Sequence, residues 1–113
     1  MHELSVTTGL VNMVTEEGKK AGATKVTKVN LVIGKCSCLV PQILTDYFAL
    51  LSEGTVAEGA EVNIKRLPGK VTCNDCHATS EIPDFRVVCP VCKSRNTTLI
   101  QGKEFYLDSL EIE

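Results

Sequence analysis

The sequence predicts an α+β protein: two helices on a small three-stranded mixed sheet, with an inserted zinc-ribbon-like module that contains four cysteines. Three observations lead to this class. Apolar residues recur at helical spacing in two segments, they alternate with polar residues in three others, and four of the six cysteines gather between the second and third alternating segments. A chain of 113 residues can form one compact unit with a small insertion, and it is too short for two full domains.

The two helices are predicted from their apolar faces and from the residues that bound them. The first covers residues 3–21, and Gly22 follows it as a residue that can adopt the left-handed conformation ending a helix. Its apolar face consists of Val6, Leu10, Met13 and Val14, with Thr7 on the polar side. The second helix begins at Pro41, because proline at the first helical position removes no N–H that the helix needs. Its predicted buried stripe consists of Ile43, Leu44, Tyr47, Phe48 and Leu51.

The three strands are predicted at residues 26–33, 61–65 and 105–112, where apolar and polar residues alternate. Because a helix lies between the first two strands, we expect them to be parallel and joined by a right-handed crossover. The third strand changes parity, so a bulge near Asp108 and Ser109 is needed to keep its apolar residues inside. Those apolar residues are Phe105, Leu107, Leu110 and Ile112.

Residues 68–102 differ in composition from the rest and are predicted to form the inserted module, with 1–67 and 103–113 as the α+β domain. Two C-x-x-C motifs, at Cys73, Cys76 and at Cys89, Cys92, are separated by 12 residues. This spacing lets both motifs converge on one tetrahedral zinc ion, and four thiolates leave no position open for catalysis. A module of about 35 residues has little core, so zinc binding would supply most of its folding energy, on the order of 10–16 kcal/mol.

Several alternatives stay open for the cysteines. Iron in a rubredoxin-like site, redox-active C-x-x-C motifs and cysteines without metal are the rivals to zinc, and His77 beside Cys76 is either a surface residue or a replacement ligand. Cys36 and Cys38 form a further C-x-C pair. They are either two small, partly buried apolar residues or an additional soft metal site or thiol switch.

Composition excludes several classes of function. With 12 basic and 14 acidic residues the chain has no excess positive charge to hold nucleic acid. The module itself has four basic residues but only Phe85 for base stacking. No apolar run approaches the ~20 residues of a membrane span, and the first residues do not form a secretory signal, so we expect a cytoplasmic protein. No catalytic constellation is evident, and we expect no enzyme.

The first three residues form a second candidate metal site. The Met1 amine, the His2 backbone nitrogen and the His2 imidazole can form fused chelate rings around one ion. A planar set of nitrogen donors suits Ni(II) or Cu(II). Glu3 can add a carboxylate or orient the imidazole. The alternative is a solvated, frayed terminus with no metal.

The whole chain resembles the HypA/HybF family of nickel metallochaperones. The residues that carry the resemblance are Met1-His2-Glu3-Leu4-Ser5, Val40-Pro41, Leu51-Ser52-Glu53-Gly54-Thr55, Glu58-Gly59-Ala60 and the paired C-x-x-C motifs. The chain departs from the family at Lys35, where an acidic residue is common, and in the C-x-C pair.

The resemblance implies that the α+β domain binds Ni(II) as cargo and that the cysteine module binds structural Zn(II). It assigns nickel to His2, assisted by Glu3, and zinc to Cys73, Cys76, Cys89 and Cys92. It implies delivery of nickel to a hydrogenase large-subunit precursor, and to urease in some organisms, together with a nickel-maturation GTPase. The alternative function is a zinc-ribbon module that binds protein or nucleic acid and has no nickel role.

Overall fold

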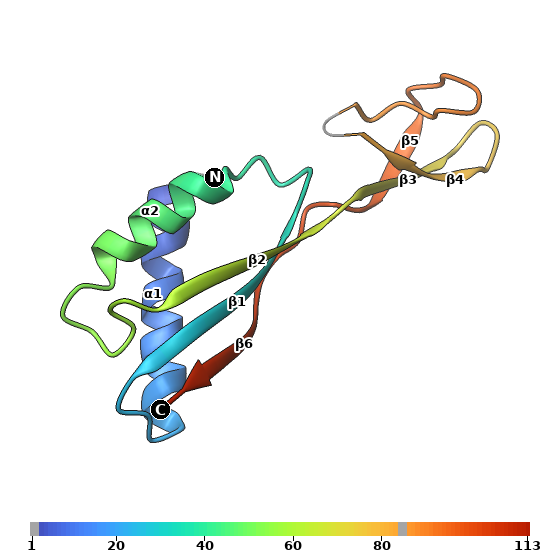
Figure 1. Cartoon of the computed structure of the whole chain (residues 1–113). Coiled ribbons are helices and arrows are strands. Elements are labelled where there is room, and N and C mark those ends of the chain that lie inside the picture. The colour runs from blue at the N-terminus through green and yellow to red at the C-terminus, as the bar shows by residue number, and fades with distance from the viewer. Residues whose placement is uncertain (1–2, 84–85) are drawn as a thin grey trace. The chain divides into compact units, whose positions relative to one another are not determined.

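The computed structural model describes residues 3–83 and 86–113 and contains two helices and six strands there. Their order is α1 (Glu3–Lys20), β1 (Val26–Gly34), α2 (Pro41–Leu51), β2 (Glu61–Leu67), β3 (Gly69–Cys73), β4 (Thr79–Ile82), β5 (Thr97–Gln101) and β6 (Phe105–Ile112) (Figure 1). None of the helices in these residues is long and apolar enough to cross a membrane.

The chain divides into two compact units. Unit 1 consists of Met1–Leu31, Leu39–Lys65 and Tyr106–Glu113, and unit 2 consists of Val32–Cys38 and Arg66–Phe105. Unit 2 therefore contains the cysteine module together with the end of β1 and the turn that follows it. The boundaries derived from the sequence, 68–102 for the module and 1–67 with 103–113 for the remainder, stay a prediction about which residues fold together.

Helix α1 contributes a buried stripe to the core of unit 1 that includes Leu10, Val11 and Val14. Two predictions about its faces were wrong. Met13 was expected inside, but its side chain is 49% exposed. Thr7 was expected outside, but it is buried, and its hydroxyl donates a hydrogen bond to the Glu3 carbonyl oxygen at 2.5 Å. Because this bond satisfies the hydroxyl, burying a threonine at this position costs little.

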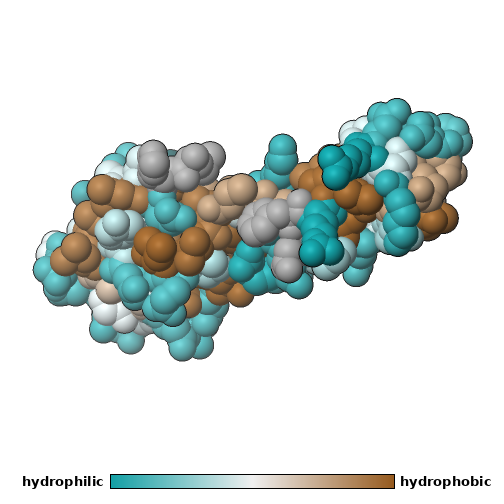
Figure 2. Space-filling model, turned by 90° about the horizontal axis from the view of Figure 1, so that it is seen from above, coloured by the Kyte–Doolittle hydropathy of each residue, from teal (hydrophilic) through white to brown (hydrophobic). Residues whose placement is uncertain are grey.

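Helix α2 begins at Pro41, as predicted, after Val40 in an extended conformation with φ −97° and ψ 110°. Leu44 and Phe48 are its buried residues. Ile43 was predicted in the buried stripe but is exposed, and Leu50 is 61% exposed. Exposed apolar side chains are visible among polar ones on the surface of unit 1 in Figure 2.

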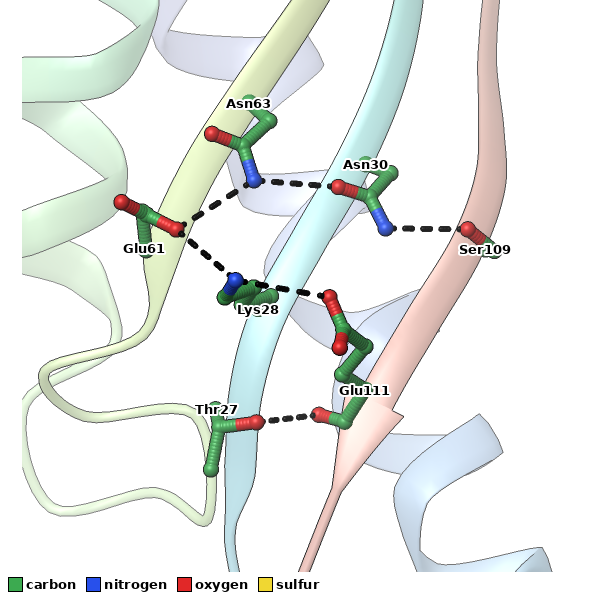
Figure 3. Close-up of polar contacts among 7 residues, drawn as sticks. All are labelled: Thr27, Lys28, Asn30, Glu61, Asn63, Ser109 and Glu111. Carbon is green, nitrogen blue, oxygen red and sulfur yellow. Dashed lines mark hydrogen bonds and ion pairs between the residues drawn. The ribbon is translucent and has the colours of Figure 1, made fainter.

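The first sheet has the strand order β2-β1-β6. Side chains bridge β1 and β2 at Lys28 with Glu61 (3.7 Å) and at Asn30 with Asn63 (3.1 Å) (Figure 3). The residue numbers increase together on both strands, so β1 and β2 are parallel. The predicted parallel pairing around a helix is confirmed.

Strand β6 pairs with β1 in the opposite direction. The Asn30 side-chain amide donates a hydrogen bond to the Ser109 hydroxyl at 3.0 Å (Figure 3). Thr27 comes earlier in β1 than Asn30, and its hydroxyl donates at 3.1 Å to the carbonyl oxygen of Glu111, which comes later in β6 than Ser109. The numbers run oppositely, so this pair is antiparallel and the sheet is mixed, as predicted.

The predicted change of parity within β6 is visible in its burial. Asp108 and Ser109 are exposed in succession, while Leu107 and Leu110 on either side of them are half-buried. Ile112 was predicted inside but is 41% exposed.

Unit 2 contains a second sheet, with the order β4-β3-β5 and antiparallel pairing throughout. Val71 at its centre pairs with Ser80 of β4 and with Leu99 of β5. Val71 also forms a small apolar cluster with Cys36 and Ile82, against which Leu99 packs. These three strands were not predicted, because segments of four or five residues show too little alternation to be recognised.

Candidate metal centre

Four cysteines from two turns of unit 2 lie around one point. Cys73 ends β3 and Cys76 lies in the turn after it, whereas Cys89 and Cys92 belong to a second turn that precedes β5. All four Sγ atoms lie within 4.8 Å of one another. The Sγ atoms of Cys73 and Cys92 are 3.5 Å apart, and those of Cys76 and Cys89 are 3.6 Å apart.

These separations fit one tetrahedral metal ion. Zinc–sulfur bonds of ~2.3 Å place tetrahedral sulfur atoms about 3.8 Å apart. A set of four thiol donors is typical of structural zinc, and it leaves no coordination position for a substrate. Cys73 and Cys89 are buried while Cys76 and Cys92 are exposed, so one side of the cluster faces the interior of unit 2.

The two cysteine turns have the same backbone design. The N–H of His77 donates to the Cys73 carbonyl oxygen at 3.0 Å, and the N–H of Lys93 donates to the Cys89 carbonyl oxygen at 2.9 Å. Both donors have left-handed backbones, with φ of 62° at His77 and 63° at Lys93. A non-glycine residue adopts this conformation at some cost in free energy. The surrounding contacts must therefore stabilise the closed turn at each cysteine pair by more than that cost.

Backbone donors stabilise negative charge on part of the cluster. The N–H groups of Cys76 and Asp75 each lie 3.4 Å from the Cys73 sulfur. The Cys76 N–H above all, against the opposing effect of burial, lowers the pKa of Cys73 to about 7. The N–H of Cys92 is the main cause of the lowered pKa of Cys89.

The other two thiols hold their protons. The Ser94 N–H lowers the pKa of Cys92, but the neighbouring thiol of Cys73, partial burial and the other two cysteines outweigh it and raise that pKa to about 12. The pKa of Cys76 is also raised, because burial and the Cys89 and Cys73 thiols outweigh the N–H of Ala78. The cluster therefore combines two thiols of lowered pKa with two of raised pKa, and a divalent cation would displace the protons that remain on them.

Polar contacts join the first cysteine turn to the segment after the second. The Ser94 hydroxyl donates to the Asp75 carboxylate, and the Asn96 amide donates to the same carboxylate at 3.4 Å. Asn74 donates its backbone N–H to the Asn96 carbonyl oxygen at 2.9 Å. These contacts hold the two turns in register without any large apolar core.

The other sulfur and imidazole candidates lie apart from this cluster. His77 is exposed and does not belong to the group of four possible ligands. Cys36 is buried with Val71 and Ile82, which matches its interpretation as a small apolar residue, whereas Cys38 is exposed with a left-handed φ of 65°. All six cysteines are free of disulfides.

Of the predicted nickel residues, Met1 and His2 lie outside the described residues, and Glu3 is the first residue of α1. Its carboxylate oxygen Oε2 accepts a hydrogen bond from the Val40 N–H at 3.0 Å. No sequence pattern indicates this contact, because it joins residues 37 positions apart through a backbone group.

A helical unit on a mixed sheet, joined to a four-cysteine unit, defines a small protein with a structural metal centre. Residues 1–112 match the family described as "Hydrogenase/urease nickel incorporation, metallochaperone, hypA", and the chain belongs to this family. The predicted resemblance is thereby confirmed.

Similar proteins agree along the whole length of the chain. It is 44% identical to "Hydrogenase maturation factor HypA" of Caldanaerobacter subterraneus, with 100% of both chains covered. It is 38% identical to the protein of the same name from Aquifex aeolicus, with 100% of this chain and 98% of the relative covered. The solution structure of the Ni metallochaperone HypA from Helicobacter pylori matches with a TM-score of 0.70 and 31% identity, over 99% of this chain and 97% of that one.

Proposed function

We propose that this chain binds Ni(II) at its N-terminus and delivers it to the large-subunit precursor of a [NiFe]-hydrogenase during maturation. Urease is the alternative acceptor. The observation that carries this proposal is the family match over residues 1–112, which includes both candidate metal sites. The two solution structures it resembles, at TM-scores of 0.70 and 0.73, cover nearly the whole chain.

The proposed nickel ligands are the Met1 amine, the His2 backbone nitrogen and the His2 imidazole. These nitrogen donors give Ni(II) the planar coordination that suits it. The hydrogen bond between Glu3 and the Val40 N–H supports this site, because it fastens the residue next to His2 to the start of α2. In this proposal Glu3 is a positioning residue for the nickel site and is itself held by the start of α2.

We propose that Cys73, Cys76, Cys89 and Cys92 hold one structural zinc ion. The support is the set of sulfur separations, the two matching turns and the N–H donors at the Cys73 sulfur. Zinc bound there would keep unit 2 folded, since the apolar cluster around Val71 is small.

The proposed setting is the cytoplasm, where a reducing environment keeps thiols free, in agreement with six cysteines that form no disulfide. The proposed partners are the hydrogenase precursor and a nickel-maturation GTPase. Nickel is cargo in this proposal, so we expect neither catalysis by the chain itself nor a nucleic acid or membrane partner.

Calorimetry of Ni(II) binding to variants of the two histidines tests the proposal. The chain has two histidines, so His2→Asn and His77→Asn make a matched pair, and asparagine tolerates the left-handed backbone at position 77. We expect His2→Asn to weaken nickel binding by at least about tenfold through the lost imidazole, while His77→Asn retains it. Equal effects of the two variants, or none from His2→Asn, would overturn the assignment.

A further inference from the structure

A groove lies on the surface of unit 1 between α1 and β6, with a volume of about 450 Å³. Met13 of α1 and Leu107, Leu110 and Ile112 of β6 contribute its apolar walls. Met13 and Ile112 are 49% and 41% exposed, although both were expected inside. Large apolar side chains exposed together along a groove are a feature of binding surfaces.

The groove follows the outer edge of a sheet. Strand β6 is the last strand in the order β2-β1-β6, so one of its edges has no neighbour among the described strands. The Glu113 N–H donates to the Lys25 carbonyl oxygen at 2.8 Å and therefore points toward β1. Because N–H groups alternate along a strand, those of Leu110 and Ile112 point away from β1, toward the open edge.

Acidic groups stand along this edge. Among the residues that the structure describes, Asp108 and Glu17 are the charged ones that line the groove, and no basic one lines it. Glu17 is balanced in part by Lys20, 3.5 Å away, and Glu111 by Lys28, 3.9 Å away, but both pairs are exposed and therefore weak. The electrostatic field along β6 thus favours a positively charged neighbour.

We propose that the β6 edge is a docking site for an extended peptide segment of a partner protein with alternating apolar and basic side chains. The segment adds to β6 as a fourth strand, and its backbone binds the N–H groups of Leu110 and Ile112. Its apolar side chains enter the groove beside Met13, and its basic side chains face Asp108. Strand addition of this kind combines backbone affinity with side-chain specificity at every second position.

A second copy of this chain fits the edge less well. Two β6 strands that paired with each other would bring Asp108 and Glu111 of both copies to the same interface. Like charges across a strand pair are destabilising. The charge pattern therefore selects a basic segment over self-association.

The test uses the full, zinc-loaded chain and a seven-residue peptide of alternating valine and lysine with blocked ends. Backbone NMR shifts should change along β6, and exchange of the Leu110 and Ile112 amides should slow. A peptide with glutamate in place of lysine should bind at least about tenfold more weakly, and N-methylation of the lysine peptide should abolish the effect. Equal binding of the lysine and glutamate peptides, or shifts confined to other elements, would overturn the proposal.

Two pairs of variants locate the site without disturbing the fold, because all four residues are exposed. Asp108→Lys should weaken binding of the lysine peptide about three- to tenfold, while Glu53→Lys, with the same change in charge, should leave that binding unaltered. Met13→Ala should weaken it, while Leu50→Ala should not. Shifts in β6 that depend on protein concentration and not on peptide would identify a second copy as the occupant and overturn the proposal.

Discussion

The Glu3 carboxylate accepts the backbone N–H of Val40 at 3.0 Å, so the first residue of α1 caps the start of α2. Val40 is the N-cap residue of α2, and no side chain of its own helix supplies a cap. In a capping box an acidic side chain in the first turn bonds the N-cap N–H, and here Glu3 supplies that bond from another helix. The negative charge also suits the positive end of the α2 dipole.

Removing this contact should weaken the attachment of the two helices. We expect Glu3→Ala to lower the free energy of unfolding by about 0.5–1.5 kcal/mol, because the bond is charged but exposed. Glu3→Gln should lower the free energy of unfolding by less, since its amide oxygen can still accept a hydrogen bond from the Val40 N–H. Urea denaturation followed by circular dichroism measures both, and equal losses in the two variants would show that the hydrogen bond is not the cause.

The positions of the helices could be predicted from the sequence, but the side chains that they bury could be predicted only in part. These positions followed from the spacing of apolar residues, from Gly22 after the end of α1 and from Pro41 at the start of α2. Which side chain is buried depends on the neighbours it meets. Thr7 can be buried at little cost because its hydroxyl bonds within its own helix, and Met13 is exposed at the groove beside β6.

The metal centre was predictable for a different reason. Ligand spacing determines whether four thiols can meet one ion, so Cys73, Cys76, Cys89 and Cys92 could be grouped without knowledge of the sheet around them. The strands β3, β4 and β5 were not predictable, since segments of four or five residues show too little alternation to be recognised. The Glu3 contact was also hidden, because any residue can supply a backbone N–H.

Glycine is required where two backbone segments of unit 2 nearly touch. A Cβ atom on Gly34 would lie 2.0 Å from the Gly102 carbonyl oxygen, and backbone cannot yield as a flexible side chain can. Gly34→Ala should therefore lower the free energy of unfolding by about 3 kcal/mol or more.

The matched control for that glycine lies in α1. Nothing lies within 4 Å of a Cβ added to Gly9, an exposed helix position. Gly9→Ala should stabilise the protein by about 0.5–1 kcal/mol through helix propensity. Thermal unfolding of both variants checks the pair, and a small loss at Gly34 would contradict the close approach of Gly102.

Zinc removal should affect the two units unequally. Unit 2 has a small apolar cluster around Val71, whereas unit 1 has a larger core that includes Val14, Leu31, Leu44 and Phe48. Chelation of zinc should expose the amides of β3, β4 and β5 to rapid hydrogen exchange while those of α1 and α2 remain protected. Simultaneous loss of protection in both units would contradict a structural metal that serves unit 2.

Zinc affinity should decrease as pH falls, because the thiols must lose their protons to bind the metal. Near pH 7.5 the Cys92 thiol, with a pKa of about 12, is protonated, and Cys73, with a pKa of about 7, is mostly a thiolate. Zinc binding should then release about two to three protons, and affinity should fall as pH decreases. The decline should steepen as pH falls through the Cys73 pKa, because that thiol then also holds a proton.

Competition with a chromophoric chelator between about pH 6 and 8.5 measures this dependence, and pH-stat titration counts the protons. Release of fewer than one proton near pH 7.5 would contradict coordination by all four sulfur atoms.

The terminal chelate is the central claim, and one added residue tests it most directly. A glycine placed before Met1 keeps every side chain but moves the free amine away from His2. By calorimetry on zinc-loaded protein, we expect the extension to weaken Ni(II) binding by at least about a hundredfold while zinc content is unchanged. Nickel affinity that is equal with and without the added glycine would contradict the account.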